Sequence, residues 1–134
     1  MATKKKILPP HANVYARLGV SRFHGVGVFA IRAIPANRRV FLGEKQETTL
    51  YPKTKVEKLE PVLKKLYEDF GVEEDGYYGV PTSFNNLTIG WFVNHNPKNP
   101  NLRCGKNYEF FSKRIIRAGE ELTVNYLTFN QKYR

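Results

Sequence analysis

Cysteine is nearly absent from this sequence, and its scarcity excludes two common ways of stabilising a small domain. The single cysteine, Cys104, cannot form an internal disulfide, and no run of cysteine and histidine has the paired spacing of a structural zinc site. A reducing compartment is the simplest inference. The 134 residues are long enough for one domain with an ordinary hydrophobic core.

Long hydrophobic runs are also missing. No apolar stretch approaches the length of a membrane span, and the first residues, MATKKKILPP, lack the apolar core of a signal peptide. We therefore expect an intracellular, soluble protein, cytoplasmic or nuclear, without a membrane partner.

Acidic side chains are few: 12, against 22 basic ones, for a formal net charge of +10. The distribution is uneven, because residues 57–75 carry seven acidic and three basic side chains. This segment is an acidic island in a basic chain. The basic remainder favours nucleic acid or nucleosomal DNA as a partner through phosphate attraction, and a merely solubilising surface explains it equally well.

The hydrophobic pattern predicts a mostly β chain with one helix. Apolar and polar residues alternate over residues 13–18, as in a strand with one buried face. Further short strands are expected at residues 28–30, 39–43, 107–111, 113–117 and 121–126. A helix should begin at Pro61 and end at Gly71, with one apolar stripe formed by Val62, Leu63, Leu66, Tyr67 and Phe70.

Two glycines one residue apart mark the segment His24-Gly25-Val26-Gly27. Glycine permits positive φ angles and has no side chain to block a ligand, so this backbone is open to close approach. A simple hairpin turn explains the same pattern when the motif stands alone.

A second polar segment follows directly on apolar chain, where Trp91-Phe-Val leads into Asn94, His95 and the sequence NPKNPN. Buried chain thus delivers an amide and an imidazole into a tight turn, although a plain loop would have the same composition. His24 and His95 lack acidic or cysteine partners at ligand spacing, so we expect no metal site.

Together with the segment Glu120-Glu-Leu-Thr and Tyr126, these motifs resemble the SET domain family of protein lysine methyltransferases, in the order that family uses. The resemblance covers roughly residues 13–126. It implies a β-clip, SET-like fold: mostly β, with small sheets around a knot-like C-terminal crossing and a short helical insert.

The resemblance also implies a domain organisation. A flexible basic arm would occupy residues 1–12, and a single SET domain would occupy residues 13–134. Within the domain, the variable helical insert falls at about residues 54–76, and a C-terminal tail follows the last motif at residues 127–134.

The activity that the resemblance implies is methyl transfer from S-adenosylmethionine (SAM) to lysine ε-amines. Tyr126 would be the catalytic residue, although a tyrosine packed at a strand end would look the same in the sequence. SAM would be held by His24, Gly25, Val26, Gly27, Asn94 and His95. Tyr78 and Phe129 would contact the substrate lysine, and ordinary packing is the alternative for both.

A basic protein tail, such as that of a histone, is the expected substrate. The acidic island would form one wall of the substrate groove and attract cationic side chains. A non-histone protein or a small amine fits the motifs as well. The main alternative is a non-catalytic SET-like module that binds chromatin or nucleic acid. A homodimer that supplies missing groove walls is a further hypothesis.

One motif departs from the family pattern. The usual segment is seven residues, Asn-His-Ser-x-x-Pro-Asn, whereas eight residues run from Asn94 to Asn101, and Asn96 replaces the serine. We interpret this as a one-residue loop insertion that spares Asn94 and His95 and leaves the placement of Asn101 open.

Overall fold

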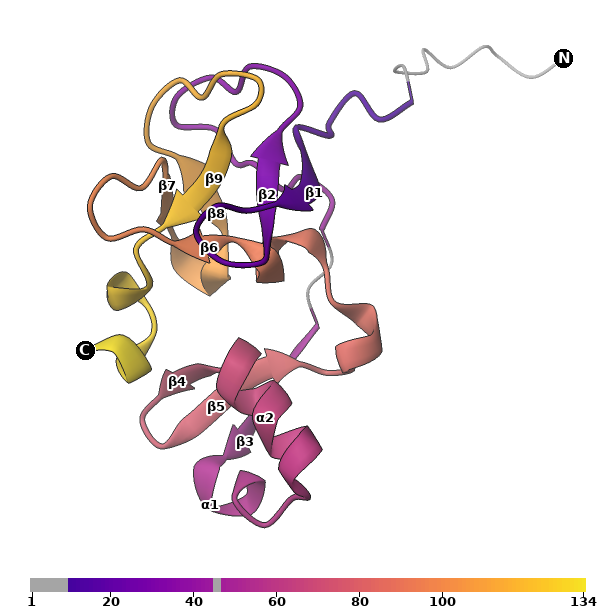
Figure 1. The fold of residues 1–134 in the computed structure, drawn as a ribbon, viewed down its shortest axis with the longest axis vertical. Helices are drawn as coiled ribbons and strands as arrows, with labels where there is room; N and C mark the ends of the chain where they lie inside the picture. Colours follow the sequence, from indigo (N-terminus) through magenta and orange to yellow (C-terminus); the bar gives the residue numbers. More distant parts are fainter. Residues whose placement is uncertain (1–9, 45–46) are drawn as a thin grey trace, which may run out of the picture.

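The structure, a computed structural model, describes residues 10–44 and 47–134 and arranges them in two lobes (Figure 1). Residues 48–81 form the insert lobe, and the other described residues form the core lobe. Most of the expected basic arm, residues 1–9, lies outside the described residues. No helix in the described ranges is long and apolar enough to cross a membrane.

The core lobe is built on a four-stranded sheet in the order β1-β2-β9-β6. β1 (Ala16–Val20) pairs antiparallel with β2 (Val26–Ala30), which pairs antiparallel with β9 (Glu121–Val124). The short strand β6 (Asn94–His95) runs parallel to β9. A second, two-stranded sheet joins β7 (Leu102–Cys104) to β8 (Phe110–Ser112).

The hydrophobic core lies between these two sheets. Val28, Ile34, Ile116 and Leu122 have no exposed surface. An isolated bridge between Ile34 and Ile116 brings the β2–β3 and β8–β9 connections together. Small sheets closed over one cluster of branched apolar residues thus account for the mostly β fold that the sequence predicted.

The insert lobe contains a three-stranded sheet in the order β3-β5-β4 and two helices. Its strands are β3 (Thr48–Pro52), β4 (Val72–Glu74) and β5 (Tyr77–Pro81). Its helices are α1 (Lys53–Val56) and α2 (Pro61–Phe70). The insert lobe therefore includes more of the chain, residues 48–81, than the segment 54–76 expected from the sequence.

The predicted helix is confirmed as α2. Pro61 occupies its first turn, where a missing N–H costs nothing, and the Gly71 N–H closes the last turn on the Tyr67 carbonyl at 2.7 Å. The apolar stripe is only partly covered, however, because no residue of α2 is fully buried and Val62 is 69% exposed.

Several predicted strands are shorter than expected or were wrong. β1 begins at Ala16 rather than residue 13, and residues 39–43 and 113–117 contribute only the single bridging residues Arg39 and Ile116. Residues 106–108 form a 3₁₀ turn instead of a strand, because Asn107 and Tyr108 adopt left-handed φ angles of 56° and 57°.

The last predicted strand ends early, at Val124. The Asn125 side chain accepts a hydrogen bond from Leu127 N at 3.0 Å and starts a 3₁₀ turn over Tyr126–Thr128. A similar turn follows at Gln131–Tyr133, and Phe84–Asn86 and Ile89–Phe92 form two more. The Gln131–Tyr133 turn packs beside β4, so the C-terminal segment lies between the two lobes (Figure 1).

Candidate functional site

Parallel pairing of β6 with β9 brings the Asn-His segment against the C-terminal motif. Asn94 lies opposite Thr123, and His95 lies opposite Val124. The His95 Nδ1 atom accepts a hydrogen bond from the Tyr126 backbone N–H at 2.9 Å, and the two rings lie 4.8 Å apart. The histidine is therefore oriented by the same turn that carries the tyrosine, with Nδ1 as the acceptor.

The side-chain amide of Asn94 links the glycine segment, residues 24–27, to the paired strands β6 and β9. Its Nδ2 atom donates to the carbonyl oxygens of His24, at 3.2 Å, and Val26, at 3.0 Å. The same group lies 3.0 Å from the Oε2 atom of Glu121. Asn94 is only 9% exposed, so these hydrogen bonds are made away from bulk water. The three motifs singled out in the sequence thus meet around one buried amide.

Glu121 is a member of this arrangement that the sequence analysis did not single out. Both of its carboxylate oxygens accept from the Ser21 hydroxyl, at 2.8 Å each, and Ser21 in turn accepts from the backbone N–H of Phe23 and His24. A Cβ atom on Gly27 would lie 2.4 Å from Glu121 Oε2. The lack of a side chain at Gly27 therefore leaves room for the carboxylate to pack directly against its backbone.

A cleft of about 760 Å³ lies beside this network; we call it the glycine-loop cleft. Five of the six residues predicted to bind a cofactor line it, namely His24, Gly25, Val26, Asn94 and His95. Gly27 lies behind them, against Glu121. Gly25 has φ +42° and nothing within 4 Å of the position that a Cβ would take, so its backbone is open to a ligand.

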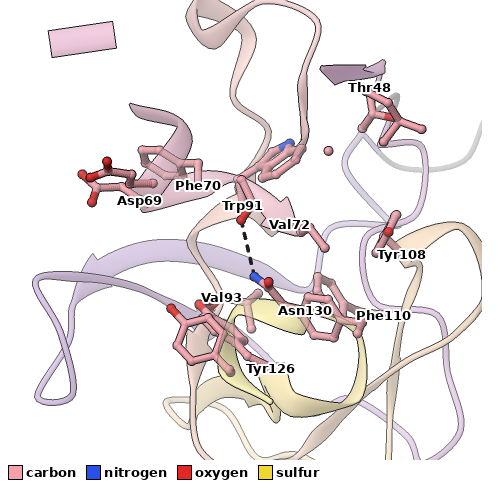
Figure 2. Close-up of a pocket in the computed structure, with 17 residues that line it drawn as sticks. Thr48, Asp69, Phe70, Val72, Trp91, Val93, Tyr108, Phe110, Tyr126 and Asn130 are labelled. Atoms are coloured by element: carbon pink, nitrogen blue, oxygen red, sulfur yellow. Dashed lines mark hydrogen bonds between the residues drawn. The ribbon is translucent and has the colours of Figure 1, made fainter. Parts of the chain in front are cut away.

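The second cavity, of about 90 Å³, is narrow and lies between the two lobes; we call it the aromatic pocket (Figure 2). The aromatic side chains that line it are Phe70, Trp91, Tyr108, Phe110, Tyr126, Phe129 and Tyr133. Phe129, predicted to contact the substrate, is among them. The sequence analysis missed Trp91 and Tyr108 as pocket residues, although Trp91 opens the apolar triplet before Asn94.

Tyr78, predicted to contact the substrate, does not line either cavity. Its ring packs 6.0 Å from that of Tyr67 within the insert lobe, and the Lys53 ammonium group lies 5.7 Å from its centroid. Its neighbour Gly79 lines the aromatic pocket instead. Because β5 alternates its side chains between two faces, Tyr78 points away from the pocket.

Tyr126 lines both cavities. Its hydroxyl donates a short hydrogen bond to the Val93 carbonyl oxygen. Burial raises the pKa of Tyr126 well above its ordinary value, and the neighbouring Tyr133 adds to the shift. The phenol is therefore neutral throughout the physiological range, so it keeps the hydrogen bond to Val93, and its oxygen can still accept one.

Two acidic residues at the end of α2, Glu68 and Asp69, also line both cavities. Asp69 accepts from the Lys65 ammonium group at 2.7 Å, in an exposed pair one helical turn apart. The acidic island therefore reaches the pocket mouth, where carboxylates attract cationic groups. In the ranges that the structure describes, no cluster of three or more His, Cys, Asp and Glu side chains is arranged to hold a metal ion.

The extra residue in the Asn94–Asn101 loop is absorbed locally. The Asn96 Oδ1 atom accepts from the backbone N–H of Lys98 and Asn99, both at 3.2 Å, and closes a turn. Asn101, only 3% exposed, donates to the Glu121 carbonyl at 2.8 Å and accepts from Thr123 N at 2.9 Å. It therefore holds β9 in place beside the site. The placement of Asn101, which the longer loop left open, is thus against β9.

Comparison with known proteins agrees with this geometry. The family model for the SET domain matches residues 25–127, and the chain belongs to that family. The chain is also similar to the crystal structure of a Plasmodium falciparum protein named as a candidate histone methyltransferase, with a TM-score of 0.57. The two are 20% identical, over 84% of this chain and 93% of the other, which shows a shared fold. No curated protein matches the sequence.

Proposed function

We propose that this chain is a SAM-dependent protein-lysine N-methyltransferase. The observation that carries the proposal is the position of Tyr126, whose side chain lines both the glycine-loop cleft and the aromatic pocket. A transferase needs two binding sites that share the point of transfer, and here that point carries a neutral hydroxyl.

The glycine-loop cleft fits SAM in its chemistry. The open backbone at Gly25 allows close approach, and the imidazole of His95 and the aromatic faces of Trp91 and Phe92 supply walls for an adenine ring and a sulfonium. The Asn94 side chain would support this cleft by holding the His24 and Val26 carbonyl groups in place through hydrogen bonds. When bound there, SAM would supply an electrophilic methyl group.

The aromatic pocket would receive the lysine side chain. Its ring faces accept the aliphatic stem and tolerate an arriving ammonium group. A free lysine has a pKa of about 10.4 and must lose a proton before it can act as a nucleophile. The narrow aromatic walls would favour the neutral amine by desolvation, and the Tyr126 hydroxyl would orient it.

Basic protein tails are the substrate class that the charges favour. Glu68 and Asp69 stand at the junction of the two cavities, where they would attract a lysine-rich segment. The Plasmodium falciparum structure is named for activity on histones, so core histones are the first substrates to test. Contact with nucleic acid, dimerisation and the compartment stay predictions from the sequence.

The test is transfer of labelled methyl groups from SAM to core histones and to bulk cell protein, with Tyr126→Phe measured in parallel. We expect label in the native reaction and a loss of about 10²–10³-fold in kcat for the variant, the size expected when one hydrogen bond that positions the transition state is removed. Calorimetry should show SAM binding to both proteins, because the variant keeps the ring that lines the cleft.

The opposite result would favour the non-catalytic alternative. If the native protein neither binds SAM nor transfers label to any of these proteins, the methyltransferase proposal fails. A salt-sensitive affinity for nucleic acid that SAM does not alter would then support a SET-like binding module.

A further inference from the structure

The aromatic pocket has one wall from each lobe, and the insert wall has little hydrophobic burial of its own. The helix α2 supplies Glu68, Asp69 and Phe70 to the lining, yet no residue of that helix is fully buried. The wall at the α2–β4 corner therefore needs other interactions to stay at a constant distance from Tyr126. The Phe70 ring lies 5.8 Å from that of Phe92, and the Tyr108 hydroxyl donates to Glu74 at 2.7 Å. The buried hydrogen bonds come from the C-terminal segment that passes beside β4 (Figure 1).

Asn130 is the buried residue of that segment, with 6% of its surface exposed. Its Oδ1 atom accepts from the Glu73 backbone N–H at 3.0 Å, and its Nδ2 atom lies 3.4 Å from the Gly71 carbonyl oxygen (Figure 2). On the core side, the Asn130 N–H donates to the Tyr126 carbonyl at 2.8 Å. One residue thus joins the corner of the insert to the turn that carries Tyr126.

The two following residues make parallel contacts at the surface. Gln131 accepts from Asp75 N at 2.8 Å and donates to the Asp75 carboxylate at 3.1 Å. Lys132 donates to the Glu68 carbonyl oxygen at 2.7 Å. These side chains are exposed, so water can replace them at little cost, whereas the backbone groups that Asn130 satisfies would lose their partners in a buried place.

We propose that Asn130 is a positioning residue that sets the width of the aromatic pocket. It fastens the Gly71–Glu73 corner of the insert to the Tyr126 turn. Without its side chain, the Glu73 N–H and the Gly71 carbonyl lose their hydrogen-bond partner and can be satisfied only by water. The Gly71–Glu73 corner then moves away from Tyr126. The pocket then fluctuates in width while the core lobe keeps its own packing. The kinetic consequence rests on the proposed methyltransferase function; the structural consequence does not.

Hydrogen exchange of the full chain tests the structural part. In Asn130→Ala we expect the amides of residues 71–75 to exchange about 10-fold faster or more, as expected from the loss of a buried hydrogen-bond pair. Amides of β2 and β9 should keep their native rates, because those strands pack in a separate hydrophobic core.

Asn125→Ala is the matched control. Asn125 and Asn130 each cap a 3₁₀ turn by accepting from the residue two positions on, at 3.0 Å from Leu127 N and 3.1 Å from Lys132 N. Only Asn130 also reaches the insert lobe. The control variant should therefore leave exchange in residues 71–75 unchanged. Asn130→Asp keeps the acceptor for Glu73 and loses the donor to Gly71, so it should be intermediate.

Steady-state kinetics test the functional part. We expect Asn130→Ala to raise the KM for a lysine peptide and to lower kcat/KM about 10-fold, while the calorimetric affinity for SAM stays close to native because the core lobe supplies most of the cleft. A general loss of folding would lower SAM binding and peptide turnover together. The Asp variant should recover part of the peptide KM.

Two outcomes would overturn the proposal. One is native exchange at residues 71–75 in Asn130→Ala, and the other is faster exchange spread equally over β2, β9 and the insert, which would mean a general role in stability. If the native protein transfers no methyl groups, the proposed function fails, and the exchange result still decides whether Asn130 holds the insert.

Discussion

The two lobes differ in how they are held together. All members of the continuous hydrophobic core, among them Val28, Ile116 and Leu122, belong to the core lobe. In the insert lobe, the buried apolar side chains are Val56, Val80 and Pro81. The core lobe is therefore a packed unit that holds the network around Asn94, and the insert is a lightly packed wall placed against it.

Edge-to-face contacts between aromatic rings take the place of a hydrophobic core in the insert lobe. The Tyr67 ring lies 5.9 Å from Tyr51 and 6.0 Å from Tyr78 within the lobe, and 5.4 Å from Phe84 of the core lobe, in edge-to-face arrangements. Such pairs add about 0.5–1.5 kcal/mol each beyond the surface they bury. The glycine-loop cleft is thus supported by a buried hydrophobic core, whereas the insert wall of the aromatic pocket is supported mainly by ring contacts.

The largest effect should come from a cavity in the core lobe. Leu122 has no exposed surface, so Leu122→Ala should lower the free energy of unfolding by about 2–5 kcal/mol. Leu63→Ala, at a position 40% exposed on α2, should change it by about 0.5 kcal/mol or less. Urea unfolding of both variants measures the contrast, and equal losses would show that the lobes do not differ in packing.

The next contrast compares two glycines. Gly27→Ala would push the Glu121 carboxylate away from Ser21 and Asn94, so SAM affinity should fall about 10-fold. Gly76→Ala, in the insert, meets no atom within 4 Å and only keeps an unfavourable φ of +85°, at a cost of about 1–2 kcal/mol in stability. Calorimetry should show native SAM affinity for Gly76→Ala; a loss there would tie the insert backbone to the cleft.

A smaller effect concerns alkaline pH. Tyrosines of the unfolded chain ionise near pH 10, whereas burial raises the pKa of Tyr126 above that value. The unfolded state then binds fewer protons, so this contribution to stability is fully present below about pH 10 and decreases above it by about 1.4 kcal/mol per pH unit. Denaturant unfolding between pH 8 and 11 should give a shallower decline for Tyr126→Phe; identical slopes would contradict the assigned burial.

The smallest effect belongs to the surface of the insert. Lys65 and Asp69 form an exposed ion pair at i and i+4, which also raises the pKa of Lys65 through its hydrogen bond to Asp69. Lys65→Ala should leave the free energy of unfolding almost unchanged, because water and salt screen an exposed ion pair. A thermal melt at low and high salt checks this; a loss comparable to that of Leu122→Ala would show that α2 is not a lightly held surface helix.

Local sequence signals predicted the helix and the site motifs better than the strand ends. α2 was predictable because Pro61, the apolar period and Gly71 lie within one segment and act locally. The strand ends were not, because an apolar pattern does not show the left-handed angles at Asn107 and Tyr108 or the turn that the Asn125 side chain starts by accepting from Leu127 N. Tyr78 was predicted at the pocket, and the alternation of β5 turns it to the other face.

The family, the residue types at the site and the order of its motifs could be predicted from the sequence, because each motif is a short run of neighbouring residues. Which groups meet depends on the tertiary structure: the Asn94 amide contacts the glycine segment, Glu121 lies behind Gly27, and Asn130 lies between the lobes. Those contacts join residues far apart in sequence. They exist because parallel pairing of β6 with β9 and the packing of the tail on β4 bring distant backbone groups within hydrogen-bond distance.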